Sequence, residues 1–436
     1  MRYIKTSLLA SVAAVALSFG AQAQSAGSNS VWLDQSGASS TADITQSGTN
    51  NRAGLSNTQR IVQGNTSAAV GFTDPFPVVG TGGNQLTINQ SGANNVIGQV
   101  GTSIESAQIG TSNTLAIQQG GSGNQLAYRQ FGINNGNVSF NGPFRAGMDP
   151  SYLSGSGALW NFVGQSGSDN QAVIEQGKVN FAATQGGINI NQTGTNGRVF
   201  LNNSEGSYSL AYMSQGGTDN SIALSQSYVG ANGLLASVYN LADLRQTGTS
   251  NRITGDQRGN NLDLRVTQSG DGNNFFNRQN ATNSAIVATQ SGLSSKVYAF
   301  QGASFVFGID FASNGAGLAS FNPGWSDKNP SLTTNARLDI VQTASSSQVI
   351  GQQIGSTLRA GVTQAGLSNG IAFLQDGAGH QADLFQNGGS GNNILLSQTG
   401  GLTAGNMATV TQGAANANLA NALQSGNGNQ LNVKQN

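Results

Sequence analysis

Glutamine recurs every eleven residues through the middle of this chain, and this spacing constrains the fold more than any other feature of the sequence. The regular stretch spans residues 241–301, with its first glutamine at Gln246. Two apolar residues precede the clearest glutamines at alternate positions, as Leu264 and Val266 precede Gln268. Residues two apart on a strand face the same side, so these three are predicted to point into an interior while Thr267 points outward.

A polar cluster follows each of these strand-like units and predicts a turn. After Gly248 the chain reads Thr-Ser-Asn, and after Gly270 it reads Asp-Gly-Asn-Asn, which are residue types that favour turns. Each eleven-residue unit is therefore predicted to form one strand and one turn. A single pair of such strands cannot bury its apolar face, so the repetition predicts an all-β solenoid in which two units close one flat strand-turn-strand rung of about 22 residues.

The pattern extends from Val31 to Gln435 with four interruptions. These lie at about residues 64–83, 136–160, 229–240 and 302–336, and they contain all six prolines. Because proline lacks the N–H that a strand ladder requires, its confinement to the interruptions supports the strand assignment. We expect the interruptions to be loops that bulge from the solenoid, while their aromatic residues, such as Phe72 and Trp325, leave open a role as contact surfaces.

The first 23 residues have the pattern of a secretory signal peptide. Arg2 and Lys5 precede an apolar run over residues 8–17, and residues 21–23 form an Ala-x-Ala cleavage site. The run is shorter than the ~20 residues that a membrane-spanning helix needs, which favours a signal peptide over an anchor. The mature chain is therefore expected to be one repeat domain over residues 24–436 that leaves the cytoplasm.

Composition narrows the class of protein further. Charged residues make up 8% of the chain, with 18 basic and 18 acidic side chains, so we expect neither nucleic-acid binding nor membrane insertion of the mature chain. There is no cysteine and one histidine, His380, which occupies a turn position where other copies carry asparagine. We predict no enzyme activity, no metal site and no cofactor, and we interpret His380 as a tolerated turn substitution.

Stacked copies are predicted to place like amides above one another. Glutamines ~4.8 Å apart can each accept a hydrogen bond from one neighbour and donate to the next, whereas an unpaired buried amide costs about 1–3 kcal/mol. The predicted glutamine ladder consists of Gln246, Gln257, Gln268, Gln279, Gln290, Gln301, Gln342, Gln353, Gln364, Gln375 and Gln386. A second ladder is predicted from turn asparagines that follow their glutamines by five residues, namely Asn51, Asn95, Asn135, Asn170, Asn220, Asn251 and Asn369. Such ladders are typical of cross-β assemblies.

The unit Gln-x-Gly-x-x-Asn, preceded by alternating small apolar residues, resembles the curlin repeat, and the resemblance covers roughly three quarters of the mature chain. It implies a subunit of curli, the bacterial functional amyloid fibres (fimbriae) of biofilm matrix and cell-surface adhesion. It also implies a homopolymer at the extracellular surface, with a nucleator subunit, an outer-membrane secretion pore and chaperones as further partners. The chain is longer than a usual curlin subunit and several copies lack the asparagine, so its role as major subunit, nucleator or adhesin stays open.

Other solenoids suggest alternative functions. A monomeric secreted adhesin would use the same rung without assembly. A polysaccharide-active β-helix needs paired carboxylates, whereas Glu105, Glu175 and Glu205 are isolated in the sequence. The glycine-aspartate calcium motif is approached only at residues 270–273, and the Thr-x-Thr rows of an ice-binding solenoid do not occur. Open strand ends favour end-to-end assembly.

Overall fold

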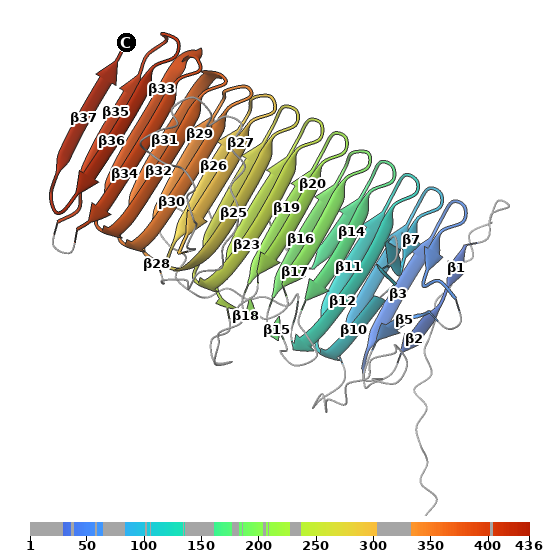
Figure 1. Cartoon of the computed structure of the whole chain (residues 1–436). Coiled ribbons are helices and arrows are strands. Elements are labelled where there is room, and N and C mark those ends of the chain that lie inside the picture. The colour runs from blue at the N-terminus through green and yellow to red at the C-terminus, as the bar shows by residue number, and fades with distance from the viewer. Residues whose placement is uncertain are drawn as a thin grey trace, which may run out of the picture.

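The computed structural model describes residues 29–35, 39–56, 59–63, 83–100, 103–104, 106–133, 135, 161–176, 183–184, 186–203, 206–207, 209–226, 237–302, 333–401 and 404–436. Over these ranges the secondary structure consists of strands, and Figure 1 shows them stacked side by side from one end of the molecule to the other. The chain is an all-β solenoid, as the repeat predicts. No helix in the described ranges is long and apolar enough to cross a membrane.

Two large parallel sheets form the walls of the solenoid. Sheet B contains β3 (Thr41–Gln46), β6 (Gln85–Gln90), β11 (Thr114–Gln119), β13 (Phe162–Gln165), β16 (Gly187–Gln192), β19 (Leu210–Gln215), β22 (Leu241–Gln246), β24 (Asp263–Gln268), β26 (Ala285–Gln290), β29 (Arg337–Gln342), β31 (Arg359–Leu367), β33 (Gln381–Ser390), β35 (Met407–Gln412) and β37 (Gln430–Gln435). Sheet A contains β1 (Ser30–Val31), β2 (Leu33–Gln35), β4 (Arg52–Ala53), β5 (Ile61–Gln63), β7 (Val96–Ile97), β10 (Ser106–Thr111), β12 (Gln125–Ile133), β14 (Gln171–Gln176), β15 (Ala183–Thr184), β17 (Arg198–Asn203), β18 (Gly206–Ser207), β20 (Ser221–Gln226), β21 (Ser237–Val238), β23 (Arg252–Asn260), β25 (Asn274–Thr282), β27 (Lys296–Gln301), β28 (Thr333–Thr334), β30 (Gln348–Ser356), β32 (Gly370–Ala378), β34 (Asn393–Gly400) and β36 (Leu419–Ser425). A separate antiparallel pair joins β8 (Gln99–Val100) to β9 (Ser103–Ile104).

The strand register confirms that two eleven-residue units make one rung. In sheet B, Gln246 pairs in register with Gln268 and Gln268 with Gln290, so neighbours in the sheet are separated by two repeats of sequence. The unit between them lies in sheet A, where Gln257 pairs with Gln279. Successive repeats therefore alternate between the two walls.

Alternation along each strand places the apolar residues between the sheets. In β24, Leu264, Val266 and Gln268 are buried, whereas Thr267 is exposed on the outer face. The inward residues of both sheets form one continuous apolar core along the solenoid. Inward burial at every second residue is the geometry of a pleated strand with one covered face.

Two of the expected interruptions end earlier than the sequence indicates. Within the interruption expected at 229–240, β21 pairs with β18 and β23, and within the one expected at 302–336, β28 pairs with β25 and β30. Each of these strands has two residues and carries no glutamine, so the repeat pattern does not reveal it. The predicted signal peptide, the six prolines, Phe72 and Trp325 lie outside the described residues.

Candidate assembly site

A row of glutamine amides runs through sheet B from Gln46 to Gln435. Each Nε2 donates to Oε1 of the next glutamine over 2.7–2.9 Å. Its members are Gln46, Gln90, Gln119, Gln165, Gln192, Gln215, Gln246, Gln268, Gln290, Gln342, Gln364, Gln386, Gln412 and Gln435. Six of the eleven glutamines predicted from the sequence lie here, and the row continues across every described strand of the sheet.

Sheet A holds a second glutamine row in two runs. The first runs from Gln63 to Gln176, and the second from Gln226 to Gln424. Predicted members of the second run are Gln257, Gln279, Gln301, Gln353 and Gln375. Between the runs, β17 places Asn203 at the register position of Gln176, and no described residue is hydrogen-bonded to Gln176 Nε2 or to Gln226 Oε1.

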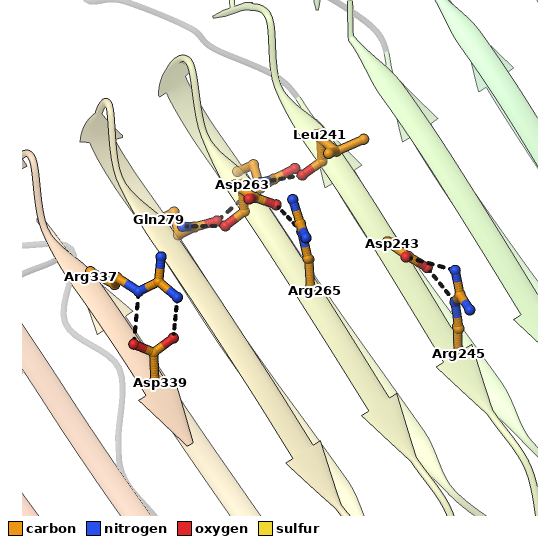
Figure 2. Close-up of polar contacts among 9 residues, drawn as sticks. Leu241, Asp243, Arg245, Asp263, Arg265, Gln279, Arg337 and Asp339 are labelled. Carbon is orange, nitrogen blue, oxygen red and sulfur yellow. Dashed lines mark hydrogen bonds and ion pairs between the residues drawn. The ribbon is translucent and has the colours of Figure 1, made fainter. Parts of the chain in front are cut away.

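Many of these glutamines also tie one sheet to the backbone of the other. Gln257 Nε2 donates to the carbonyl of Leu241 at 3.1 Å, and Gln279 Nε2 donates to the carbonyl of Asp263 at 3.3 Å. Figure 2 shows the second of these contacts beside Asp263. The amide therefore joins neighbouring rungs and the two walls of the solenoid at once, which explains how a polar side chain is accommodated in a buried position.

The predicted turn asparagines fall into two rows rather than one. Asn135 follows a strand of sheet A, whereas the other six follow strands of sheet B. Asn251 is typical of the larger row. Its Oδ1 accepts the backbone N–H of Asn273 at 3.0 Å, and its Nδ2 donates to the carbonyls of Thr247 at 2.9 Å and Gly270 at 2.7 Å.

The larger row has members that were not among the predicted asparagines. Asn124, Asn273 and Asn392 accept backbone N–H groups in the same way as Asn251. Asn124 and Asn273 also follow their glutamines by five residues, so the same spacing in the sequence could have identified them. Asn392 follows Gln386 by six residues because an extra residue lengthens that turn.

His380 takes the place of an asparagine in the smaller row and reproduces two of the hydrogen bonds that such an asparagine makes. Its Nδ1 accepts the backbone N–H of Asn406 at 3.0 Å, and its Nε2 lies 3.1 Å from the carbonyl of Asp376, four residues earlier. The two contacts together require the neutral ring with its proton on Nε2. His380 is fully buried, so its role is that of a structural acceptor.

Paired charges lie on the outer face of sheet B, as Figure 2 shows. Asp243 binds Arg245 at 2.8 Å, Asp263 binds Arg265 at 3.1 Å, and Arg337 binds Asp339 at 2.7 Å, each pair two residues apart on one strand. Burial raises the pKa of the Asp263 carboxyl, against the opposing charge of Arg265. Among the described residues, no three histidine, cysteine, aspartate or glutamate side chains gather as a metal site.

In the part of the chain that the structure describes, the strands at the two ends of sheet B leave their core residues partly exposed. Ala42 and Ile44 on β3 and Leu431 and Val433 on β37 are only half-buried, whereas the matching residues of inner strands are buried. The glutamine row of sheet B also has a direction. Gln46 donates to Gln90, and Gln435 accepts from Gln412, so the row presents an acceptor oxygen at the β3 end and a donor amide at the β37 end.

Residues 240–270 match the curlin associated repeat. The chain contains a curlin repeat. The match covers β22, β23 and β24, which include the bond between Gln246 and Gln268 and the turn of Asn251. The curlin repeat is a structural repeat, and the amide rows carry its pattern through the rest of the solenoid. No curated protein matches the chain.

Proposed function

We propose that this curlin-repeat protein is a structural subunit of an extracellular amyloid-type fibre of the curli kind, in biofilm matrix and surface adhesion. It assembles by adding one solenoid to the end of another, and it has no catalytic role. One observation carries the proposal: the donor end of the amide row at Gln435 is complementary to the acceptor end at Gln46.

The apolar residues at the two ends support the same assembly. Ala42, Ile44, Leu431 and Val433 line the core of the terminal rungs while remaining half-buried. Unpaired backbone groups above an apolar interior are a template for a further strand, because pairing removes both from water. A donor end meets an acceptor end only in head-to-tail stacking, which does not close and therefore yields an open fibre.

Export and partners follow as further parts of the proposal. A fibre subunit of this kind is secreted to the cell surface after removal of residues 1–23, through an outer-membrane pore and with chaperones that delay assembly. A nucleator subunit would supply the first open end. The subunit role itself, whether major subunit, nucleator or adhesin, is best assigned from fibres isolated from the native bacterium.

Electron microscopy and fibre diffraction of the mature chain, residues 24–436, test the proposal. We expect unbranched fibres with reflections near ~4.8 Å and ~10 Å, the spacings of stacked strands and facing sheets. Val433→Glu places a charge in the half-buried end of the core and should block elongation, whereas Gln430→Glu lies on the exposed face of the same strand and should not. A mature chain that stays monomeric for weeks at high concentration would favour the monomeric adhesin instead.

A further inference from the structure

Exposed apolar residues lie on the outer face of sheet A at both ends of the solenoid. Leu423 is 75% exposed and Leu419 48% exposed on β36, the last strand of that sheet, and Trp32 is 37% exposed at the first rung, between β1 and β2. On sheet B, Lys434 of β37 and Asp43 of β3 also point outward at opposite ends, and neither forms an ion pair with a described residue. All five side chains stand beside the surfaces that end-to-end stacking would bring together.

The register inside the chain fixes where these side chains would meet. Glutamine lies over glutamine at every described junction of sheet B, so Gln46 of a second copy follows Gln435, and Asp43 falls two residues from the position opposite Lys434. In sheet A, Gln35 likewise follows Gln424, which places Trp32 opposite Asn421 and diagonally between Leu419 and Leu423. A diagonal neighbour on an adjacent strand lies about 7–8 Å away, within reach of an indole or a lysine side chain.

Resting on the proposed function, we infer that the junction between two copies is closed on its outer faces by a seam specific to this chain. Trp32 of one copy covers Leu419 and Leu423 of the other on sheet A, and Lys434 pairs with Asp43 across the junction on sheet B. The partner is a second copy of this chain in head-to-tail orientation. The seam covers apolar surface that is exposed in the single copy and selects this register over a slipped one.

Ion pairs between rungs already occur within the chain. Arg129 binds Glu175 at 3.0 Å across neighbouring strands of sheet A, and Arg278 reaches Asp256 on the preceding strand at 3.5 Å. The junction would therefore use the same kind of ion pair between rungs, with its two partners offset by two residues instead of directly opposite. Charges of opposite sign at the two ends also disfavour contacts between like ends, since those would bring Lys434 near Lys434 or Asp43 near Asp43.

Engineered cysteines test the register, because the chain has none of its own. Gln430 and Thr41 are exposed and fall opposite each other in the inferred register. Strands about 4.8 Å apart lie within the range of Cα separations that a disulfide spans. Mixed fibres of Gln430→Cys and Thr41→Cys chains should cross-link, whereas Asn432→Cys with Thr41→Cys, shifted by two residues, should not.

Substitution of the seam tests its contribution to elongation. Trp32→Ala and Leu423→Ala should each raise the critical concentration for fibre growth, and Phe200→Ala, on the same outer face but at an inner rung and 46% exposed, should leave it unchanged. Lys434→Glu should raise it by at least about twofold, the scale of an exposed ion pair, and adding Asp43→Lys to the Lys434→Glu chain should restore it.

The outcomes separate the seam from the proposed function. Fibres that grow equally well with Trp32→Ala and with Lys434→Glu, or that cross-link only in the shifted pair, would reject the seam and leave the fibre function standing. Absence of fibres from the unmodified mature chain would reject both.

Discussion

Gln268 Nε2 donates a hydrogen bond to Gln290 Oε1 at 2.8 Å, and Gln246 donates to Gln268 at 2.9 Å. Gln268 therefore accepts one bond and donates another while fully buried. Its neighbour Thr267 is exposed on the opposite face of the same strand. This contrast between adjacent positions allows the inward and outward faces to be tested with a single kind of substitution.

Gln268→Glu should slow fibre elongation more than Thr267→Glu does. The buried carboxylate has no hydrogen to donate to Gln290 and loses its hydration, whereas a surface glutamate should cost no more than ~0.5 kcal/mol. Elongation rates of seeded fibres measure the difference. Lowering the pH toward about 4 should restore the Gln268→Glu chain selectively, because a protonated glutamate donates again. Equal impairment of the two variants would mean that the assignment of faces is wrong.

His380→Asn should retain the stability of the chain, and His380→Leu should reduce it. Asparagine accepts the N–H of Asn406 and donates to the carbonyl of Asp376, as asparagines do elsewhere in these rows. Leucine leaves that buried N–H unpaired, at a cost of about 1–3 kcal/mol. Urea unfolding of the dilute monomer measures the effect, and a leucine variant as stable as the asparagine variant would contradict the acceptor role of His380.

Gly248→Ala should destabilise the chain at the turn between β22 and β23. Gly120→Ala, in the turn between β11 and β12, should leave the stability unchanged. Gly248 has φ of 97°, and a Cβ there would clash with the carbonyl oxygen of Gly270 in the next rung. At Gly120 the nearest atom to such a Cβ is Ser91 Oγ at 3.5 Å, an ordinary contact. We expect a loss of about 1–3 kcal/mol for the first variant and a change within ~0.5 kcal/mol for the second, measured by the urea midpoint. Equal midpoints would show that the turn relaxes around the added methyl group.

The free energy of unfolding of the wild-type chain should decrease as the pH rises above the ordinary pKa range of aspartate. Asp263→Asn should abolish the part of this decrease that Asp263 causes. Burial raises the pKa of the Asp263 carboxyl, so the folded chain keeps a proton that the unfolded chain has lost. The folded state binds more protons in this interval, and its free energy of unfolding therefore decreases as the pH rises through it. The free energy of unfolding of both chains, measured at pH values from about 3 to about 7, tests this difference, because the range includes the ordinary pKa of aspartate. Parallel pH profiles would contradict the effect of burial on Asp263.

The period and the parity of the repeat were predictable from the sequence because both are local. Leu264, Val266 and Gln268 share one side of a strand whatever lies around them, since the pleat alternates side chains at every residue. Eleven residues per strand and turn, and two such units per rung, follow from the same pattern. The buried position of these residues and the solenoid itself could thus be inferred before any neighbour was known.

Which copies become neighbours was decided only by the tertiary structure. Gln290 binds Gln342 across 52 residues, Asn135 joins a different row from Asn51, and β21 and β28 enter sheet A without a glutamine of their own. His380 likewise becomes an acceptor only because Asn406 is stacked beside it. These relationships depend on which strands are paired along the solenoid, and that pairing joins residues far apart in the sequence. The repeat determined which side chains point inward and which hydrogen-bonding groups they carry. The closure of the solenoid determined which residues become their hydrogen-bond partners.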